Sequence, residues 1–168
     1  MKFSAPKALA IILASSVLSL SACNAPTPLR NEVAQRIAAP AWMVQRPSKT
    51  DAFTFTAYER MHEKNAPVSV YIEGEGTASR TNSGTPLDPT PTNPVGLHLS
   101  AMDKSANVAY IARPCQFTNP THYDHPIARP EDCSRAFWGN KRFAPEVITA
   151  YNNVLDNIAR QYGTNGFN

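Results

Sequence analysis

The N-terminus limits which residues of this chain can enter a fold, because it has the layout of a secretory signal. Lys2 and Lys7 precede an uncharged apolar run from Ala8 to Leu20, as in the signal peptides that direct export. The run is shorter than the roughly 20 residues that a helix needs to cross a bilayer, which argues against a permanent transmembrane anchor. We therefore expect residues 1–22 to be removed as a signal peptide.

Cys23 stands directly after this signal. The run Leu20-Ser21-Ala22-Cys23 resembles the bacterial lipobox, in which small residues fit the peptidase and the cysteine thiol accepts diacylglycerol. The resemblance implies a lipoprotein of the cell envelope, anchored to a membrane through lipid on Cys23 and facing the periplasm. The alternative is an ordinary signal peptide that is cut nearby, with Cys23 incidental. Stable anchoring needs more than one acyl chain, because a single chain binds membranes only weakly.

Charge and composition argue against a nucleic-acid partner and predict a tether. The formal net charge is +3, and it falls to +1 if Lys2 and Lys7 leave with the signal, so no nucleic-acid-binding surface is expected. Residues 24–48 are rich in proline and alanine and show no lasting apolar period. We expect residues 23–49 to form a flexible tether between the lipid and the folded part.

The three cysteines leave an even pair if one of them carries the lipid. With Cys23 acylated, Cys115 and Cys133 remain, and export would place them in an oxidising compartment. A disulfide across a loop of that length stabilises a fold by roughly 3 kcal/mol in the chain-entropy model. Two separate thiols are the alternative to a Cys115–Cys133 disulfide.

Apolar patterns predict two strands at the start of the folded region, which we expect over residues 50–168. Phe53, Phe55 and Ala57 alternate with polar residues, a period typical of a half-buried strand. Val68–Ile72 is β-branched and aromatic and runs into a glycine turn, which indicates an inner strand.

Two helices and a further strand follow in the same region. Asn93-Pro94 is a helix start, and Val95, Leu99 and Met102 then share one face of a short helix. Residues 107–111 form a second apolar, strand-like run. Residues 145–162 have the clearest amphipathic spacing, and a glycine at position 163 stands where a helix ends. The alternation of strands and helices predicts an α/β fold with a mostly parallel sheet and flanking helices.

The glycine turn after the second strand is the segment with the clearest chemical potential. Gly74, Glu75 and Gly76 follow the strand directly. Glycine lets the backbone approach a ligand, and backbone N–H groups at the carboxyl end of a parallel strand can hold a developing oxyanion. Without further evidence, however, glycine after a strand is more often only a turn.

Four stretches of the sequence carry a family resemblance. They are Tyr71-Ile72-Glu73-Gly74-Glu75-Gly76, then Asp88-Pro89-Thr90-Pro91-Thr92-Asn93-Pro94, then Tyr110-Ile111-Ala112-Arg113-Pro114-Cys115-Gln116, and finally Trp138 with Arg142-Phe143 and Pro145-Glu146-Val147. Over residues 51–168 the chain resembles the N-terminal half of a proteobacterial group of α/β-hydrolases of the serine ester hydrolase type. The resemblance implies that the turn after the third strand supplies an oxyanion-hole N–H from Glu75, with Gly74 and Gly76 giving it room. Many relatives have His-Gly where this chain has Glu73-Gly74.

The nucleophile elbow of such hydrolases is missing from these residues. The family needs Gly-x-Ser-x-Gly after its fifth strand, followed by an acid and a histidine, and none of the serines here has glycines two residues away on both sides. We therefore expect no catalytic residue in this chain, which would be truncated and inactive alone, or completed by a separately encoded C-terminal half. In that fold the third strand lies between the fourth and the fifth. Val68–Ile72 would then be an exposed apolar edge.

Other polar groups have simpler explanations. His122, Asp124 and His125 lie close in sequence, but prolines crowd the stretch and no second ligand cluster is present, so a solvated loop is favoured and no metal or cofactor is expected. His62 and His98 stand alone and are expected at the surface.

Two charged groups near the glycine turn leave alternatives open. Glu73 and Glu75 could form an acid and base pair, although the glycines there break the strand. Arg113 could bind an anionic substrate, but an ion pair with Glu73 or Asp88 is preferred. The alternative to a hydrolase part is a non-enzymatic periplasmic lipoprotein that binds a partner through its exposed sheet edge or its proline-rich loop.

Overall fold

The computed structural model describes residues 30–76, 88–118 and 133–168. The predicted signal peptide over residues 1–22, the lipidation site Cys23 and the group His122, Asp124 and His125 lie outside the described residues. The predictions for them therefore stay predictions.

A four-stranded mixed sheet forms the centre of the described fold. Its strands are β1 (Val44–Lys49), β2 (Thr54–Met61), β3 (Ser69–Ile72) and β4 (Asn107–Ile111), in the spatial order β1-β2-β4-β3. β2 runs antiparallel to β1 and to β4, whereas β3 and β4 are parallel. In this register Ala57 lies opposite Ile111, and Tyr71 lies opposite Tyr110.

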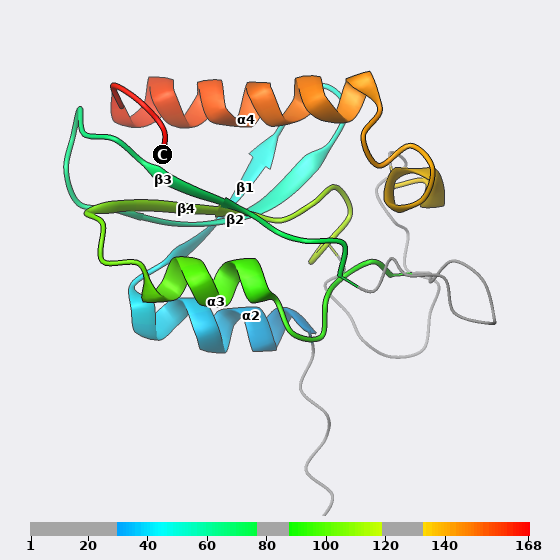
Figure 1. The fold of residues 1–168 in the computed structure, drawn as a ribbon, viewed down its shortest axis with the longest axis horizontal. Coiled ribbons are helices and arrows are strands. Elements are labelled where there is room, and N and C mark those ends of the chain that lie inside the picture. The colour runs from blue at the N-terminus through cyan, green and yellow to red at the C-terminus, as the bar shows by residue number, and fades with distance from the viewer. Residues whose placement is uncertain (1–29, 77–87, 119–132) are drawn as a thin grey trace, which may run out of the picture.

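Helices cover both faces of the sheet. The helices α2 (Arg30–Ala38) and α3 (Val95–Met102) lie side by side under one face, and α4 (Pro145–Tyr162) crosses the other face (Figure 1). Two short 3-10 helices, η2 (Ala39–Ala41) and η3 (Arg135–Trp138), complete the elements. Every residue of β4 is buried, because its alternating side chains enter the core on the α2–α3 side and the core under α4 in turn.

The mixed sheet confirms the α/β class and corrects the expected strand directions. A mostly parallel sheet was expected, but two of the three strand pairs are antiparallel. The prediction went wrong because it placed no strand before residue 50 and assumed that each strand wants a parallel neighbour. β2 sits between β1 and β4 and runs against both, so it is buried over most of its length rather than half-buried.

The expected tether over residues 23–49 is folded from Arg30 onward. Ala34 and Ala38 of α2 enter the core beneath the sheet, and β1 pairs with β2 over six residues. β1 has mostly exposed side chains, so backbone hydrogen bonds rather than apolar burial hold it in place. No apolar period marks such an edge strand, which is why the sequence resembled a linker.

The clearest expected helix has the predicted bounds. α4 spans Pro145–Tyr162, and Gly163 ends it in the left-handed conformation with φ +64°. Tyr162 in the last turn donates a 2.6 Å hydrogen bond from its hydroxyl to a carboxylate oxygen of Glu59 in β2, and burial raises the pKa of Tyr162 to about 12. This contact fixes the end of α4 to the sheet.

The chain's last residues lie against the outer edge of β3. Val68 and Phe167 form a parallel bridge, and Val70 donates its backbone N–H to the carbonyl of Asn168 over 3.0 Å. The predicted exposed edge over Val68–Ile72 is therefore covered by the chain itself as far as Val70. Ile72 remains 49% exposed.

Candidate functional site

Three chain segments meet at the carboxyl end of the parallel strands β3 and β4. They are the glycine turn after β3 (residues 73–76), the segment before α3 (residues 88–94) and the loop after β4 (residues 112–118). We call this region the carboxyl-edge site. In open α/β sheets, ligands bind in the crevice outside the carboxyl ends of the strands. The carboxyl-edge site is therefore the candidate ligand-binding region.

Gly76 is the position in the turn where only glycine fits. Its φ is +61°, and an added Cβ would lie 2.4 Å from the carbonyl oxygen of Pro89 and 3.0 Å from the nitrogen of Pro91. An added Cβ at Gly74, by contrast, would meet nothing within 4 Å. The turn therefore passes so close to the Pro89–Pro91 backbone that any side chain at position 76 would push the two segments apart.

Gln116 holds the three segments together. Its buried side-chain nitrogen donates to the carbonyls of Gly74 (3.2 Å) and Pro89 (3.3 Å), and its side-chain oxygen accepts the backbone N–H of Arg113 (3.0 Å). Gln116 ends one of the stretches that carry the family resemblance, but no sequence pattern predicted its tying role. A lone polar residue in an irregular loop carries no pattern that separates it from a surface residue.

Thr90 adds a second tie of the same kind. Its hydroxyl accepts the backbone N–H of Phe117 over 2.8 Å, and the side chain is fully buried. Phe117 and Cys115 both have positive φ, +54° and +69°, so the loop after β4 is sharply folded where it meets the segment before α3. The site is built by backbone that buried polar side chains keep in an uncommon conformation.

The buried carboxylate of Glu73 accepts three hydrogen bonds. One of its oxygens accepts the backbone N–H groups of Gly74 (2.9 Å) and Gly96 (3.2 Å), and the other accepts the hydroxyl of Tyr110 (3.0 Å). Gly96 lies in the first turn of α3, where the helix end carries partial positive charge. Burial, followed by the nearby Glu73 charge, raises the pKa of Tyr110 well above its usual range, so Tyr110 stays a neutral donor.

Of the three backbone N–H groups at positions 74–76, two remain as candidate oxyanion donors. The N–H of Gly74 is already bonded to Glu73, whereas no partner within the described segments takes the backbone N–H of Glu75 or of Gly76. Both residues are exposed. The Glu75 carboxylate forms an ion pair with Arg142, with 2.9 Å between the carboxylate oxygen and the guanidinium Nε. The turn can therefore present two N–H groups to an incoming oxygen.

One prediction about a charged group is not met. Arg113 was expected to pair with Glu73 or Asp88, but it donates to the carbonyl of Arg142 (3.1 Å) and lies 5.2 Å over the ring of Phe143. Asp88 pairs with Arg30 instead, at 3.4 Å. The ion-pair prediction is wrong because Glu73 points into the fold, where Tyr110 and two backbone N–H groups already satisfy it.

The predicted disulfide between Cys115 and Cys133 is present, with the Cα atoms 5.6 Å apart. It ties the loop after β4 to the segment that leads into η3. Phe137 packs edge-on against Phe53 with 4.8 Å between ring centroids, and Trp138 is buried. These aromatic rings cover the core beside the disulfide.

The remaining polar candidates do not gather at the carboxyl-edge site. His62 and His98 are exposed, as expected, and both lie on the α2–α3 side. Within residues 30–76, 88–118 and 133–168, no group of three or more histidine, cysteine, aspartate or glutamate side chains is placed to hold a metal ion. Glu73 and Glu75 face different partners, Tyr110 and Arg142, so they do not form an acid and base pair.

No protein-family model matches this chain, and neither a curated protein nor a solved structure does. The function is therefore proposed from the family resemblance of the sequence, the strand order and the geometry of the carboxyl-edge site.

Proposed function

We propose that this chain is the N-terminal part of an α/β-hydrolase domain in an envelope lipoprotein, related to serine esterases and lipases and inactive alone. The observation that carries the proposal is the strand order. β3 lies between β4 on one side and Gly166–Asn168 on the other, and it runs parallel to both. That is the arrangement of the third, fourth and fifth strands in the resembled fold.

The positions of the helices support the same topology. The chain moves from β3 through α3 to β4, and then from β4 through α4 back past β3 to Phe167. Because parallel crossovers are right-handed, a reversal of direction in the sheet puts the two helices on opposite faces. α3 and α4 do lie on opposite faces (Figure 1). A ligand crevice forms where the direction reverses, and the glycine turn opens there.

The strand count also agrees with the resemblance. The resemblance puts the glycine turn after the third strand, whereas apolar patterns alone found only one strand ahead of Val68. β1, which those patterns missed, makes β3 the third strand in chain order. The role assigned to the turn then belongs to the N–H groups of Glu75 and Gly76, which no described residue accepts and which can donate to an acyl oxyanion.

Acyl transfer would still need a nucleophile from elsewhere. An oxyanion hole and binding alone leave only a small residual catalysis, and no serine of this chain stands in a Gly-x-Ser-x-Gly elbow. We propose that the serine, acid and base come from a C-terminal segment whose first strand continues from Gly166–Asn168. Neither a cofactor nor a metal is part of this proposal.

A fluorophosphonate probe, which reacts only with an activated serine, tests the proposal. The coding DNA after the codon for Asn168 is read for Gly-x-Ser-x-Gly within about one strand length, roughly 5–6 residues. The chain is then expressed alone and together with that product. Labelling is expected only in the combined sample, and it should vanish when the elbow serine is replaced by alanine. Labelling of this chain alone, or the absence of any elbow-coding frame, would contradict the proposal.

Anchoring through Cys23 has its own test, since it does not depend on the hydrolase. Among the described residues no helix combines the length and apolar character that a membrane span requires. Metabolic labelling with an alkyne fatty acid should mark the wild-type chain and lose the mark in Cys23→Ser. Cys133→Ser is the matched control and should keep it. A label that survives Cys23→Ser would refute the lipid site.

The alternative function is a non-enzymatic envelope lipoprotein that binds a partner through the edge of β3. One observation favours it: the outer edge is covered only as far as Val70, and Ile72 is 49% exposed. Backbone groups at such an edge can accept another strand. A stable complex with the downstream product that never labels with the probe would support this alternative over the hydrolase.

A further inference from the structure

We infer that the α2–α3 face of the domain lies on the membrane that holds the lipid of Cys23, with Trp42 at the lipid interface and basic side chains against anionic phospholipid headgroups. This inference rests on the lipid anchor proposed above. It concerns the side of the fold away from α4 and uses no residue of the carboxyl-edge site.

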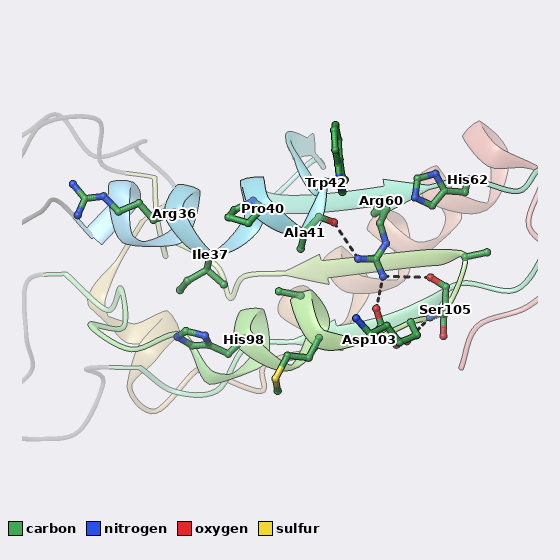
Figure 2. Close-up of a pocket in the computed structure, with 14 residues that line it drawn as sticks. Arg36, Ile37, Pro40, Ala41, Trp42, Arg60, His62, His98, Asp103 and Ser105 are labelled. Atoms are coloured by element: carbon green, nitrogen blue, oxygen red, sulfur yellow. Dashed lines mark hydrogen bonds between the residues drawn. The ribbon is translucent and has the colours of Figure 1, made fainter.

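A groove of about 690 Å³ runs between α2 and α3. Ile37, Pro40 and Ala41 line it from α2 and η2, and Met102 lines it from α3. Trp42 also lines it, and Figure 2 shows its ring at the edge of the lining residues, pointing away from Arg60 and Asp103. Trp42 is 79% exposed, the largest exposed fraction among the exposed large apolar residues described.

Backbone structure holds Trp42 in this position. The residue has φ +59°, the left-handed region that a bulky residue avoids. It caps η2 by donating its backbone N–H to the carbonyl of Ala39 over 3.0 Å. Met43, the next residue, is buried in the core. The turn therefore buries one neighbour and presents the indole ring to the outside in a backbone conformation that the surrounding structure must hold.

An apolar stripe on α3 continues this surface. The sequence placed Val95, Leu99 and Met102 on one face of the helix, and that face is the exposed one, with exposed fractions of 55%, 48% and 65%. Leu97 and Ser100 fill the core instead. Because residues i, i+4 and i+7 align on a helix, the stripe is continuous, and Met102 joins it to the groove.

The charges around the groove are mostly positive. Arg36, Arg60 and Lys104 line it, and Asp103 is the one acidic residue in the described lining. Arg36 also forms an ion pair with Glu32 of α2 at 3.8 Å, so Arg60 and Lys104 carry most of the excess positive charge. Arg60 is fixed by hydrogen bonds from its guanidinium to the carbonyl oxygens of Ala41 (3.0 Å) and Ser105 (3.3 Å) (Figure 2). Basic residues beside exposed apolar groups fit an anionic lipid surface.

The distance from the anchor selects this face. Seven residue steps separate Cys23 from Arg30, so the start of α2 lies within about 25 Å of the lipid-bearing residue. α2 itself is about 14 Å long and leads through η2 directly to Trp42. α4 lies on the far side of the sheet (Figure 1). Because the short tether joins the lipid to α2, the α2–α3 face is favoured over the α4 face for contact with the membrane.

Aromatic residues at the lipid interface and a second attachment are physically favourable. Tryptophan is enriched at membrane–water interfaces because its ring is amphipathic. A basic patch adds to the affinity that acyl chains supply. A second copy of this chain, or the proposed C-terminal segment, are the other occupants that could cover the stripe. Neither explains the basic residues that line the groove, whereas an anionic membrane does.

Quenching of tryptophan fluorescence by brominated lipids tests the inference. The chain has two tryptophans, and Trp138 is 5% exposed, so Trp138→Phe leaves Trp42 as the reporter. The acylated full chain is reconstituted into vesicles of phosphatidylethanolamine and phosphatidylglycerol with brominated or plain acyl chains. We expect bromine to reduce the Trp42 emission by about half, because interfacial groups insert about 5–10 Å deep.

Matched variants give the orientation and the role of charge. Ile148 on α4 is 49% exposed on the opposite face, so the triple variant Trp42→Phe, Trp138→Phe, Ile148→Trp should show little quenching. In the Trp138→Phe background, Arg36→Glu with Lys104→Glu should weaken the quenching of Trp42 without releasing the acylated protein from the vesicles.

The outcomes separate this inference from the proposal on which it rests. An acylated, vesicle-bound protein in which Trp42 is unquenched, or quenched no more than the tryptophan at position 148, overturns this inference alone. The inference is also overturned if a second copy of the chain or the downstream product, rather than lipid, covers Trp42. If mass spectrometry finds no acyl chains on the protein and the protein does not bind the vesicles, the lipid anchor and this inference are both overturned.

Discussion

Replacing Gly76 by alanine should destabilise the domain far more than the same change at Gly74, two residues earlier. An alanine at φ +61° costs about 1–2 kcal/mol, because the left-handed region crowds a Cβ atom. The new methyl group would also lie 2.4 Å from the carbonyl oxygen of Pro89, and overpacking of this kind costs about 1–3 kcal/mol. The free energy of unfolding should therefore fall by about 2–5 kcal/mol.

Gly74→Ala is the matched control. It adds the same methyl group to the same turn, but nothing lies within 4 Å of the position that its Cβ would take, and its φ is not in the left-handed region. Its effect should stay within about 0.5 kcal/mol, as for other surface substitutions.

Urea unfolding of both variants and of the wild type, followed by far-ultraviolet circular dichroism under non-reducing conditions, measures the difference. Equal midpoints at equal slope for Gly76→Ala and Gly74→Ala would refute the reasoning. The turn would then not be pressed against Pro89, and the placement of the Glu75 and Gly76 N–H groups would lose its support.

Three further outcomes are expected in the same urea assay. Replacing Cys115 and Cys133 by serine should cost about 3 kcal/mol, since the closed loop spans 18 residues; an unchanged midpoint would mean that the disulfide contributes nothing. Tyr110→Phe should cost about 1–3 kcal/mol, because Glu73 loses its hydroxyl donor, and no loss would show that water replaces it. Burial raises the pKa of Glu59, so the folded state binds this proton more tightly than the unfolded state, and stability falls as pH rises through the folded pKa. Glu59→Gln should flatten that fall at pH values above the usual glutamate pKa of about 4.3; a slope as steep as that of the wild type would contradict it.

The candidate site shows the limit of single-sequence reasoning. The glycine turn could be placed after a strand because glycine and apolar runs mark both elements locally. The role of Gln116 and Thr90 could not be predicted, since each ties the site together through partners 27 or more residues away in the chain. The resemblance already named the Glu75 N–H as a donor. Excluding the Gly74 N–H needed the side-chain position of Glu73, which no local pattern contains.

The sequence by itself determined the elements whose stability comes from their own pattern. The amphipathic run from Pro145 to Tyr162 with Gly163 behind it specifies α4, and the apolar run over residues 107–111 specifies β4. Tertiary structure alone decided that residues 44–49 form a strand, that β2 opposes both neighbours, and that Gly166–Asn168 lie beside β3. These features depend on backbone hydrogen bonds between distant segments. Such bonds are the same for every amino acid except proline, so the side-chain pattern does not record them.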